Sequence, residues 1–229
     1  GLLAFILKAL DFLLKPFGIS LLSFMNLKDF DLEKNLYTEK YSNNKKIFSE
    51  IYKNYYWKSK ESLSGSGSDF KVTKKYSKNL NKFCKNYKIK SFFDIPCGDF
   101  LFMNEFLKNK NISYTGGDIV EELIEVNQKK FFKYRFIYFD IANDRIDDYF
   151  DLLHVRDCLF HFSFEDIEKT LKNIINFKGK YILISNHKSL FLKNINIKTG
   201  KFRYLDLEKK PYFFPKPITK IKDYNFGNF

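Results

Sequence analysis

Two side chains in residues 156–161 (RDCLFH) have the types and the spacing that acid–base chemistry needs. Asp157 and His161 are four residues apart, so a helical turn would place both on one face. Asp157 would then orient the imidazole while His161 takes a proton from a reacting hydroxyl group, a step that contributes roughly 10²–10⁴-fold to a rate. The alternative is that His161 caps the next helix. Arg156 is expected either to hold an anionic group by a bidentate contact or to pair with Asp157, and we predict these three residues as the catalytic set.

Other polar side chains lie close to this segment in the expected fold. His187 follows a later apolar segment and is a second candidate base. Lys188, Lys201 and Arg203 would line the rim of such a site and bind a phosphate group, or else they are ordinary exposed charges. His154 lies in the middle of an apolar run and is expected in the core.

An acidic residue stands at or near the end of each of three short apolar segments: Asp94, Asp118 and Asp140. If these segments are neighbouring parallel strands, their carboxyl ends meet at one edge of the sheet, where open parallel sheets bind ligands. Asp118, 24 residues after Asp94, is then placed to accept hydrogen bonds from ribose hydroxyls. Asp140 would accept from the amino group of an adenine, and Ile141 would cover one face of its ring. The sequence therefore predicts a cofactor that contains adenosine.

The turn after the first of these segments excludes most nucleotide cofactors. A dinucleotide site needs GxGxxG so that the backbone can approach a pyrophosphate, and a P-loop needs a lysine that contacts phosphates. Residues 95–100 (IPCGDF) hold one glycine, Gly98, and Asp99 would repel a phosphate. The sulfonium and ammonium groups of S-adenosylmethionine, in contrast, tolerate Asp94 and Asp99. We therefore predict S-adenosylmethionine as the cofactor and S-adenosylhomocysteine as its product.

Strands that alternate with helices must position these residues. Apolar segments of strand length are separated by segments with helical periodicity, which is typical of a parallel sheet with helices on both faces. The expected strands are 91–95, 113–119, 135–141, 150–155 and 180–185, and the expected helices are 71–87, 99–108, 121–132 and 164–177. The predicted fold class is α/β.

The first part of the chain is expected to be helical. Residues 1–27 start with an apolar helix of about 13 residues, too short for the roughly 20 that cross a bilayer. It would pack against the body or a second copy of the chain, or lie on the inner membrane as a peripheral contact. Residues 28–88 would form a helical cap, in which 62–69 (SLSGSGSD) are either a flexible linker or a lid over the cofactor. The catalytic domain is expected over 89–229.

The chain is strongly basic, with 40 Lys and Arg against 27 Asp and Glu and a net charge of +13. Such a charge attracts nucleic acid, anionic lipid or phosphorylated small molecules. The lysines are spread along the chain, and no RNA-binding module is visible, which argues against a nucleic-acid partner. Three cysteines at irregular spacing indicate reduced thiols in a cytoplasmic protein. No zinc-ligand spacing is present, so no metal is expected.

An ordered set of motifs resembles the class I S-adenosylmethionine-dependent methyltransferases over roughly residues 57–217. The resemblance is strongest to a bacterial subgroup associated with surface-polysaccharide (capsule) genes. It rests on a tryptophan, SGSGS, a threonine, DIPCGD, GGDIV, a third-strand aspartate, RDCLxH and PxxxPxP. In this chain these are Trp57, 64–68, Thr73, 94–99, 116–120, Asp140, 156–161 and 211–217.

The resemblance implies a Rossmann-like sheet and the transfer of a methyl group to a small anionic or sugar-like acceptor. An oxygen of a sugar or phosphorylated precursor of a capsule polysaccharide is one such acceptor, and a phosphoramidate-type capsule modification is equally compatible with these residues. It also implies that the SGSGS stretch is a lid. The cofactor-binding residues that it implies are Trp57, Ser64, Gly65, Ser66, Gly67, Ser68, Thr73, Asp94, Pro96, Cys97, Gly98, Asp118, Ile119, Asp140, Ile141 and Arg156. The family's seven-stranded sheet needs a C-terminal hairpin, for which residues 201–205 (KFRYL) are one candidate partner.

Two other functions fit part of the sequence. An RNA methyltransferase would use the positive charge and would need a basic face that carries aromatic residues. A non-enzymatic membrane-associated scaffold would use the apolar N-terminal helix and a decayed cofactor fold, but the acids kept at the strand ends argue against decay. The NPPY or DPPY motif of many amine and base methyltransferases is absent after the fourth strand, which favours an oxygen acceptor.

Overall fold

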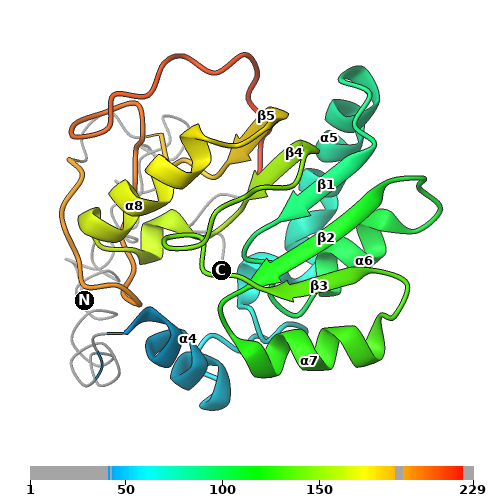
Figure 1. Cartoon of the computed structure of the whole chain (residues 1–229), viewed down its shortest axis with the longest axis horizontal. Helices are drawn as coiled ribbons and strands as arrows, with labels where there is room; N and C mark the ends of the chain where they lie inside the picture. The colour runs from blue at the N-terminus through cyan, green and yellow to red at the C-terminus, as the bar shows by residue number, and fades with distance from the viewer. Residues whose placement is uncertain (1–40, 42, 189–192, 224–229) are drawn as a thin grey trace, which may run out of the picture.

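A computed structural model describes residues 41, 43–188 and 193–223 of the 229-residue chain. Within them, five strands form one parallel sheet in the order β3–β2–β1–β4–β5 (Figure 1). The chain therefore has the predicted α/β, Rossmann-like fold, and the strand order reverses next to β1, which marks the topological switch point of an open sheet. The strands are β1 (Ser91–Asp94), β2 (Ser113–Asp118), β3 (Arg135–Tyr138), β4 (Phe150–Val155) and β5 (Gly179–Ile184).

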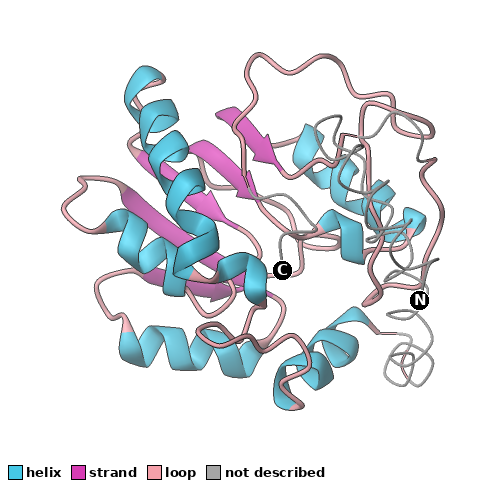
Figure 2. Ribbon diagram, turned by 180° about the vertical axis from the view of Figure 1, so that it is seen from behind, coloured by secondary structure: helices cyan, strands magenta, loops and turns pink. Residues whose placement is uncertain are grey.

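Helices cover both faces of the sheet. Helices α5 (Phe70–Asn86) and α6 (Leu101–Leu107) cross the face seen in Figure 2, and α8 (Phe164–Ile175) covers the opposite face seen in Figure 1. Helix α7 (Glu121–Lys130) packs against β2 and β3. Helix α4 (Asn44–Lys53) lies beside the carboxyl ends of the strands.

Alternation along the strands divides the core into two apolar layers. In β1, Phe92 belongs to the cluster under α5 and α6, whereas Phe93 belongs to the cluster under α8. Leu152 and Leu153 of β4 divide in the same way, because successive side chains of a strand point to opposite faces. All six residues of β4 are buried, as expected for a central strand of a parallel sheet covered on both faces.

Most expected elements are present with shorter ends. The expected strand 135–141 stops at Tyr138, because the Asp140 carboxylate accepts hydrogen bonds from Ala142 N (2.9 Å) and Asn143 Nδ2 (2.7 Å) and folds the chain into a turn. The described part of the expected helical cap 28–88 contains two α-helices, α4 and α5; the N-cap of α4, Asn43, accepts from Lys46 N.

The expectation that residues 201–205 supply a further strand is wrong, since they form none. Arg203 N donates instead to Phe160 O (3.1 Å), and Leu205 N donates to His187 Nδ1 (3.2 Å), so this segment closes over the loops that follow β4 and β5.

The expected N-terminal helix at 1–27 and its membrane or subunit contacts lie outside the described residues. None of the described helices has the length and hydropathy of a membrane span.

Candidate active site

One pocket opens at the carboxyl ends of β1, β2 and β3, and it contains about 1130 Å³ of empty space with its open mouth included. It is lined by Asp94 and Asp118, the last residues of β1 and β2, and by Asp140, two residues after β3. This is the juxtaposition that the sequence predicts for an adenosine site. The predicted site residues that line the pocket are Trp57, Ser64, Ser68, Asp94, Pro96, Cys97, Gly98, Asp118, Ile119, Asp140, Ile141, Arg156, Asp157 and His161.

The turn after β1 is closed around Gly98. This residue has φ +55°, and a Cβ placed on it would lie 2.3 Å from Ser64 Oγ, so the turn requires glycine. Gly98 N donates to Asp118 Oδ2 (3.0 Å), and Asp99 N donates to Ser64 Oγ (3.0 Å). The turn therefore connects the β2 aspartate to the SGSGS stretch.

Residues 62–69 lie against this turn and do not hang free as a flexible linker would. The Asp99 carboxylate accepts from Ser62 Oγ (2.9 Å) and from Leu63 N (2.8 Å). Gly65, Ser66 and Gly67 are not among the residues that line the pocket, and neither is Thr73, whose Oγ1 donates to Asp69 O in the first turn of α5 (3.0 Å). Of residues 62–69, Leu63, Ser64 and Ser68 line the pocket, so the SGSGS stretch itself meets it through its two outer serines.

The surroundings of Asp118 raise the pKa of its carboxyl group. Its side chain is buried, and this desolvation raises its pKa to about 6 from an ordinary value of 3.8. Hydrogen bonds from Gly98 N and Val120 N (3.1 Å to Oδ1) stabilise the charged form and oppose the rise. Near neutral pH the carboxylate form still predominates and can accept a further hydrogen bond.

Arg156 forms a bridge between three segments of the chain. Its Nε and Nη2 donate to the two carboxylate oxygens of Asp223 (2.8 and 3.2 Å), its Nη2 also donates to Gly67 O (2.8 Å), and its Nη1 pairs with Asp157 (3.0 Å). Of the two roles predicted for Arg156, the structure bears out the pairing with Asp157. A substrate anion would have to compete with two carboxylates for this guanidinium.

The expectation that Asp157 orients His161 across a helical turn is wrong. Asp157 has φ +51°, and only a short 3₁₀ turn, η3 (Leu159–His161), follows it. The imidazole is held instead by the carbonyl of Lys201, which accepts from Nδ1 (2.9 Å), and it lies against the ring of Trp57 with centroids 4.5 Å apart. Because Nδ1 carries the proton in that bond, Nε2 of the neutral ring keeps its lone pair.

Burial lowers the pKa of His161 to about 4, and that of His187 to about 4 as well, so both rings are neutral near pH 7. Their tautomers differ. His187 Nδ1 accepts from Leu205 N, so the proton of the neutral ring is on Nε2. Of the two candidate bases, His161 is therefore the one that presents an unprotonated Nε2.

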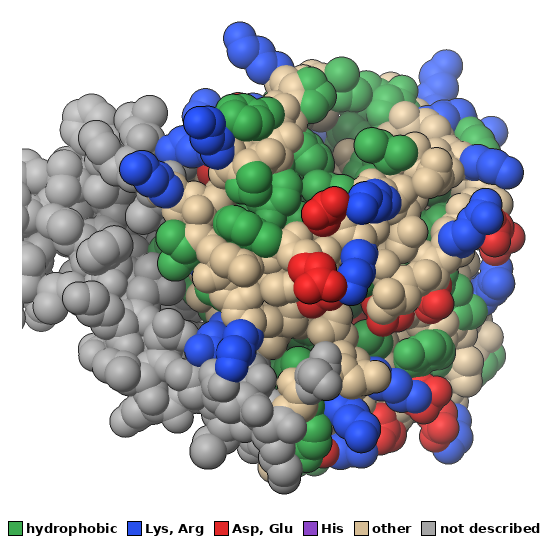
Figure 3. All heavy atoms as spheres, turned by 60° about the vertical axis from the view of Figure 1, so that its left-hand side comes forward, with side chains coloured by type: hydrophobic (Ala, Val, Ile, Leu, Met, Phe, Trp, Pro, Cys, Tyr) green, Lys and Arg blue, Asp and Glu red, His purple; other side chains and the backbone are tan. Residues whose placement is uncertain are grey.

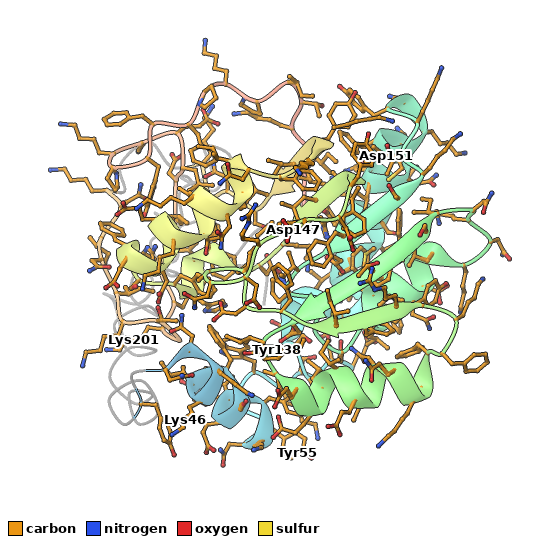
Figure 4. All side chains as sticks on the ribbon, viewed as in Figure 1. Lys46, Tyr55, Tyr138, Asp147, Asp151 and Lys201 are labelled. Carbon is orange, nitrogen blue, oxygen red and sulfur yellow. The ribbon has the colours of Figure 1, made fainter. Side chains whose placement is uncertain are left out.

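The three rim cations predicted from the sequence have different environments. Arg203 is buried, donates from Nη1 to Phe162 O and lies over the ring of Phe164, so its placement at an exposed rim is wrong. Lys201 lies at the pocket end of the molecule and supplies its carbonyl to His161 (Figure 4). Lys188 lines a second pocket.

This second pocket lies beyond the ends of β4 and β5 and shares His154, Arg156 and Asp157 with the first. The segment 214–223, which passes above β5 in Figure 1, forms its outer wall. Its side chains include four cations and three acids: Arg156, Lys188, Lys220 and Lys222 against Asp157, Glu208 and Asp223. All three acids are paired with Arg156 or Lys220, so the pocket carries a small positive excess.

Several residues that line the first pocket were not predicted as site residues. Phe48, Ile51 and Tyr52 come from α4, and Leu123 comes from α7. The four-residue spacing between Phe48 and Tyr52 was visible in the sequence, but it does not say which surface the helix covers.

The pocket has no thiol nucleophile. Cys97 and Cys158 line it, but burial raises the pKa of both, which keeps them protonated. Each of the three cysteines is buried as a free thiol. Across residues 43–188 and 193–223, no cluster of three or more His, Cys, Asp or Glu is arranged to hold a metal ion.

Comparison with known proteins gave structural likenesses alone: no protein-family model and no curated protein matches this chain. A methyltransferase from Clostridium acetobutylicum, described as S-adenosylmethionine-dependent, is 23% identical over 45% of this chain and 45% of its own, with a TM-score of 0.39. A TehB-like methyltransferase from Corynebacterium glutamicum is 18% identical over 46% of this chain and 57% of its own, with a TM-score of 0.39.

The plantazolicin methyltransferase BpumL, solved with a pentazolic desmethylPZN analogue and S-adenosylhomocysteine, is 21% identical over 71% of this chain and 62% of its own, with a TM-score of 0.46. The chain thus spans about half the length of the solved proteins that it matches. At these identities a likeness concerns the fold and not the activity.

Proposed function

We propose that this protein is an S-adenosylmethionine-dependent methyltransferase that holds its cofactor in the first pocket. The observation that carries the proposal is the meeting of Asp94, Asp118 and Asp140 around one pocket at the ends of three adjacent strands.

The donor set fits this cofactor better than it fits a phosphorylated one. Asp94 and Asp99 lie at the turn where a phosphate would have to sit, and their charges attract a sulfonium and an ammonium group instead. Asp118 would accept from the ribose hydroxyls. Asp140 would accept from the adenine amino group, with Ile141 against the ring.

When bound, S-adenosylmethionine supplies a methyl group that its sulfonium activates. The residues of the chain then need to align the acceptor with that group and exclude water. The segment 62–69, fixed to Asp99 and Arg156, would cover the methionine end of the cofactor.

His161 would take the proton from an acceptor hydroxyl. Its Nε2 lone pair is set by the Nδ1 bond to the Lys201 carbonyl, and its low pKa keeps the ring unprotonated.

The acceptor would be a small anionic or sugar-like molecule that lies across the two pockets, which share Arg156 and Asp157, so that its hydroxyl reaches His161 in the first. The positive excess there, with Lys188 and Lys222 in its wall, favours a phosphate group on that acceptor. The motif resemblance supports a precursor of a surface polysaccharide. RNA is less favoured, because cations and acids are interspersed on the face shown in Figure 3 and form no continuous basic patch there.

The test is transfer of a radiolabelled methyl group from S-adenosylmethionine to nucleotide sugars, sugar phosphates and bulk tRNA in parallel reactions. We expect label in a phosphorylated sugar. His161→Ala should lower that rate by roughly 10²–10⁴-fold while the affinity for S-adenosylhomocysteine is unchanged, and His187→Ala, the matched control, should keep more of it. Label in tRNA alone would overturn the proposed acceptor.

A further inference from the structure

A chain of buried hydrogen bonds runs from the first pocket through the sheet to α5. Asp94 Oδ1 and His154 Nδ1 are 2.6 Å apart, and His154 Nε2 and the hydroxyl of Tyr76 are also 2.6 Å apart. The three residues are 3%, 1% and 4% exposed. His154 was expected in the core and lies there, but both nitrogens of its ring make hydrogen bonds.

The sheet register brings these groups together. Asp94 and His154 are direct partners across the parallel pair β1–β4. On the other side of β1, the hydroxyl of Tyr114 donates to Asp94 Oδ2 (2.8 Å). Each oxygen of the carboxylate therefore receives one hydrogen bond from a neighbouring strand, which fixes the rotation of the side chain.

The carboxylate of Asp94 sets which atoms donate and which accept in this series of hydrogen bonds. An ionised carboxylate can only accept, so His154 Nδ1 carries a proton, and in the neutral imidazole Nε2 then accepts from the Tyr76 hydroxyl. The Arg156 guanidinium lies over the Tyr76 ring, 5.1 Å from its centroid, and helps to hold that ring in place. This series of hydrogen bonds thus gives His154 one defined tautomer and ends at the packed ring of Tyr76.

Asp94 keeps further accepting capacity. Two oxygens offer about four lone-pair positions, of which His154 and Tyr114 use two. Asp94 also lines the first pocket, beside the turn assigned to the methionine end of the cofactor. A buried carboxylate that is oriented by a tyrosine and a histidine and borders a pocket is suited to receive a cation.

We propose that His154 is a positioning residue: with Tyr76 behind it and Tyr114 opposite, it holds Asp94 in the orientation that receives the ammonium group of the cofactor's methionine end. This inference rests on the proposed function and deepens it. The contribution of His154 is directional, so it affects ligands that carry the ammonium group and spares those that lack it.

The experiment is calorimetry with two ligands, S-adenosylhomocysteine and 5′-methylthioadenosine, which lacks the aminocarboxypropyl group. Tyr114→Phe and His154→Leu should each raise the Kd for S-adenosylhomocysteine roughly tenfold, as expected for one lost charge-assisted hydrogen bond. The Kd for 5′-methylthioadenosine should change less than about twofold. His154→Asn, which retains a donor near the position of Nδ1, should recover part of the loss.

Tyr181→Phe is the matched control, because Tyr181 lies on β5 and its ring packs against Phe83 of α5 and Tyr87, the C-cap of that helix. If His154→Leu does not fold, Tyr114→Phe decides the question with the fold retained. Equal weakening of both ligands, or of neither, would overturn the positioning role. Failure of the unaltered protein to bind either ligand would refute the proposed function instead.

A second measurement does not depend on any ligand. The chain has three histidines, so their ring nitrogens can be assigned in ¹⁵N spectra from single substitutions. We expect His154 to carry its proton on Nδ1, as His161 does, and His187 to carry its proton on Nε2. An Nε2-protonated His154 would contradict the proposed chain.

Discussion

The buried carboxylate of Asp118 should make cofactor affinity depend on pH in a range where an ordinary aspartate would have no effect. Its pKa of about 6 means that about nine tenths of the protein carries the ionised form at pH 7 and about one tenth at pH 5. If only the ionised form accepts from the ribose hydroxyls, the Kd for S-adenosylhomocysteine rises about tenfold between these pH values. An aspartate with the ordinary value of 3.8 would stay more than nine tenths ionised at both.

The assay is a titration followed by the fluorescence of Trp57, the chain's one tryptophan, which lines the pocket. Asp118→Asn should bind more weakly and show no slope between pH 5 and pH 8. Asp151→Asn should keep the slope, because Asp151 is a buried acid at the amino end of β4, at the opposite edge of the sheet (Figure 4). A constant Kd for the unaltered protein, or a slope that persists in Asp118→Asn, would refute the reasoning.

Three further results are expected. At saturating S-adenosylmethionine, which removes the effect of Asp118 on cofactor affinity, the rate should fall as pH drops through about 4, because His161 acts unprotonated and burial lowers its pKa. An acidic limb near 6.5 under these conditions would count against His161 as the base. Asp223→Asn should speed the dissociation of S-adenosylhomocysteine by roughly tenfold in stopped-flow fluorescence, because it weakens the contact of Arg156 that also anchors the lid. Glu208→Gln is its control. It weakens the ion pair between Glu208 and Lys220 of the same C-terminal segment, and the dissociation rate should not change. Asp151→Asn should lower the free energy of unfolding in urea by about 1–3 kcal/mol, because it weakens hydrogen bonds to two backbone N–H groups and a lysine; an unchanged urea midpoint would show that these bonds contribute little.

The sheet and the strand-end acids could be predicted because their signals are local. A run of apolar residues that ends in an acid fixes both the strand and the position of its last side chain, so Asp94, Asp118 and Asp140 could be assigned to one edge before the structure was known. Their gathering in one pocket follows from parallel pairing in the order β3–β2–β1.

The partners of the site residues could not be predicted in this way, because they come from distant segments. Lys201 is 40 residues from His161, Asp223 is 67 from Arg156, and neither belongs to a regular element. Contacts of this kind depend on how irregular segments cross the ends of the strands, which no periodicity encodes. The prediction that Asp157 is the partner of His161 was wrong for this reason. It relied on closeness in sequence, whereas the actual partner, the Lys201 carbonyl, is brought to His161 only by the tertiary fold.

The role of His154 illustrates the same limit from inside the sheet. Its position in an apolar run correctly indicated burial, but the run does not indicate that Asp94 lies opposite on β1 or that Tyr76, 78 residues earlier, lies behind it. A buried histidine needs hydrogen-bond partners. Residues at the same register of adjacent strands, such as Asp94 opposite His154, are the first candidates for these partners.

The most direct test of the central claim is a crystal structure of the protein grown with saturating S-adenosylhomocysteine. We expect electron density for the ligand in the first pocket, with the ribose at Asp118, the adenine amino group at Asp140 and the amino group of the homocysteine end at Asp94. Density at another place, or a pocket without ligand at saturating concentration, would contradict the account.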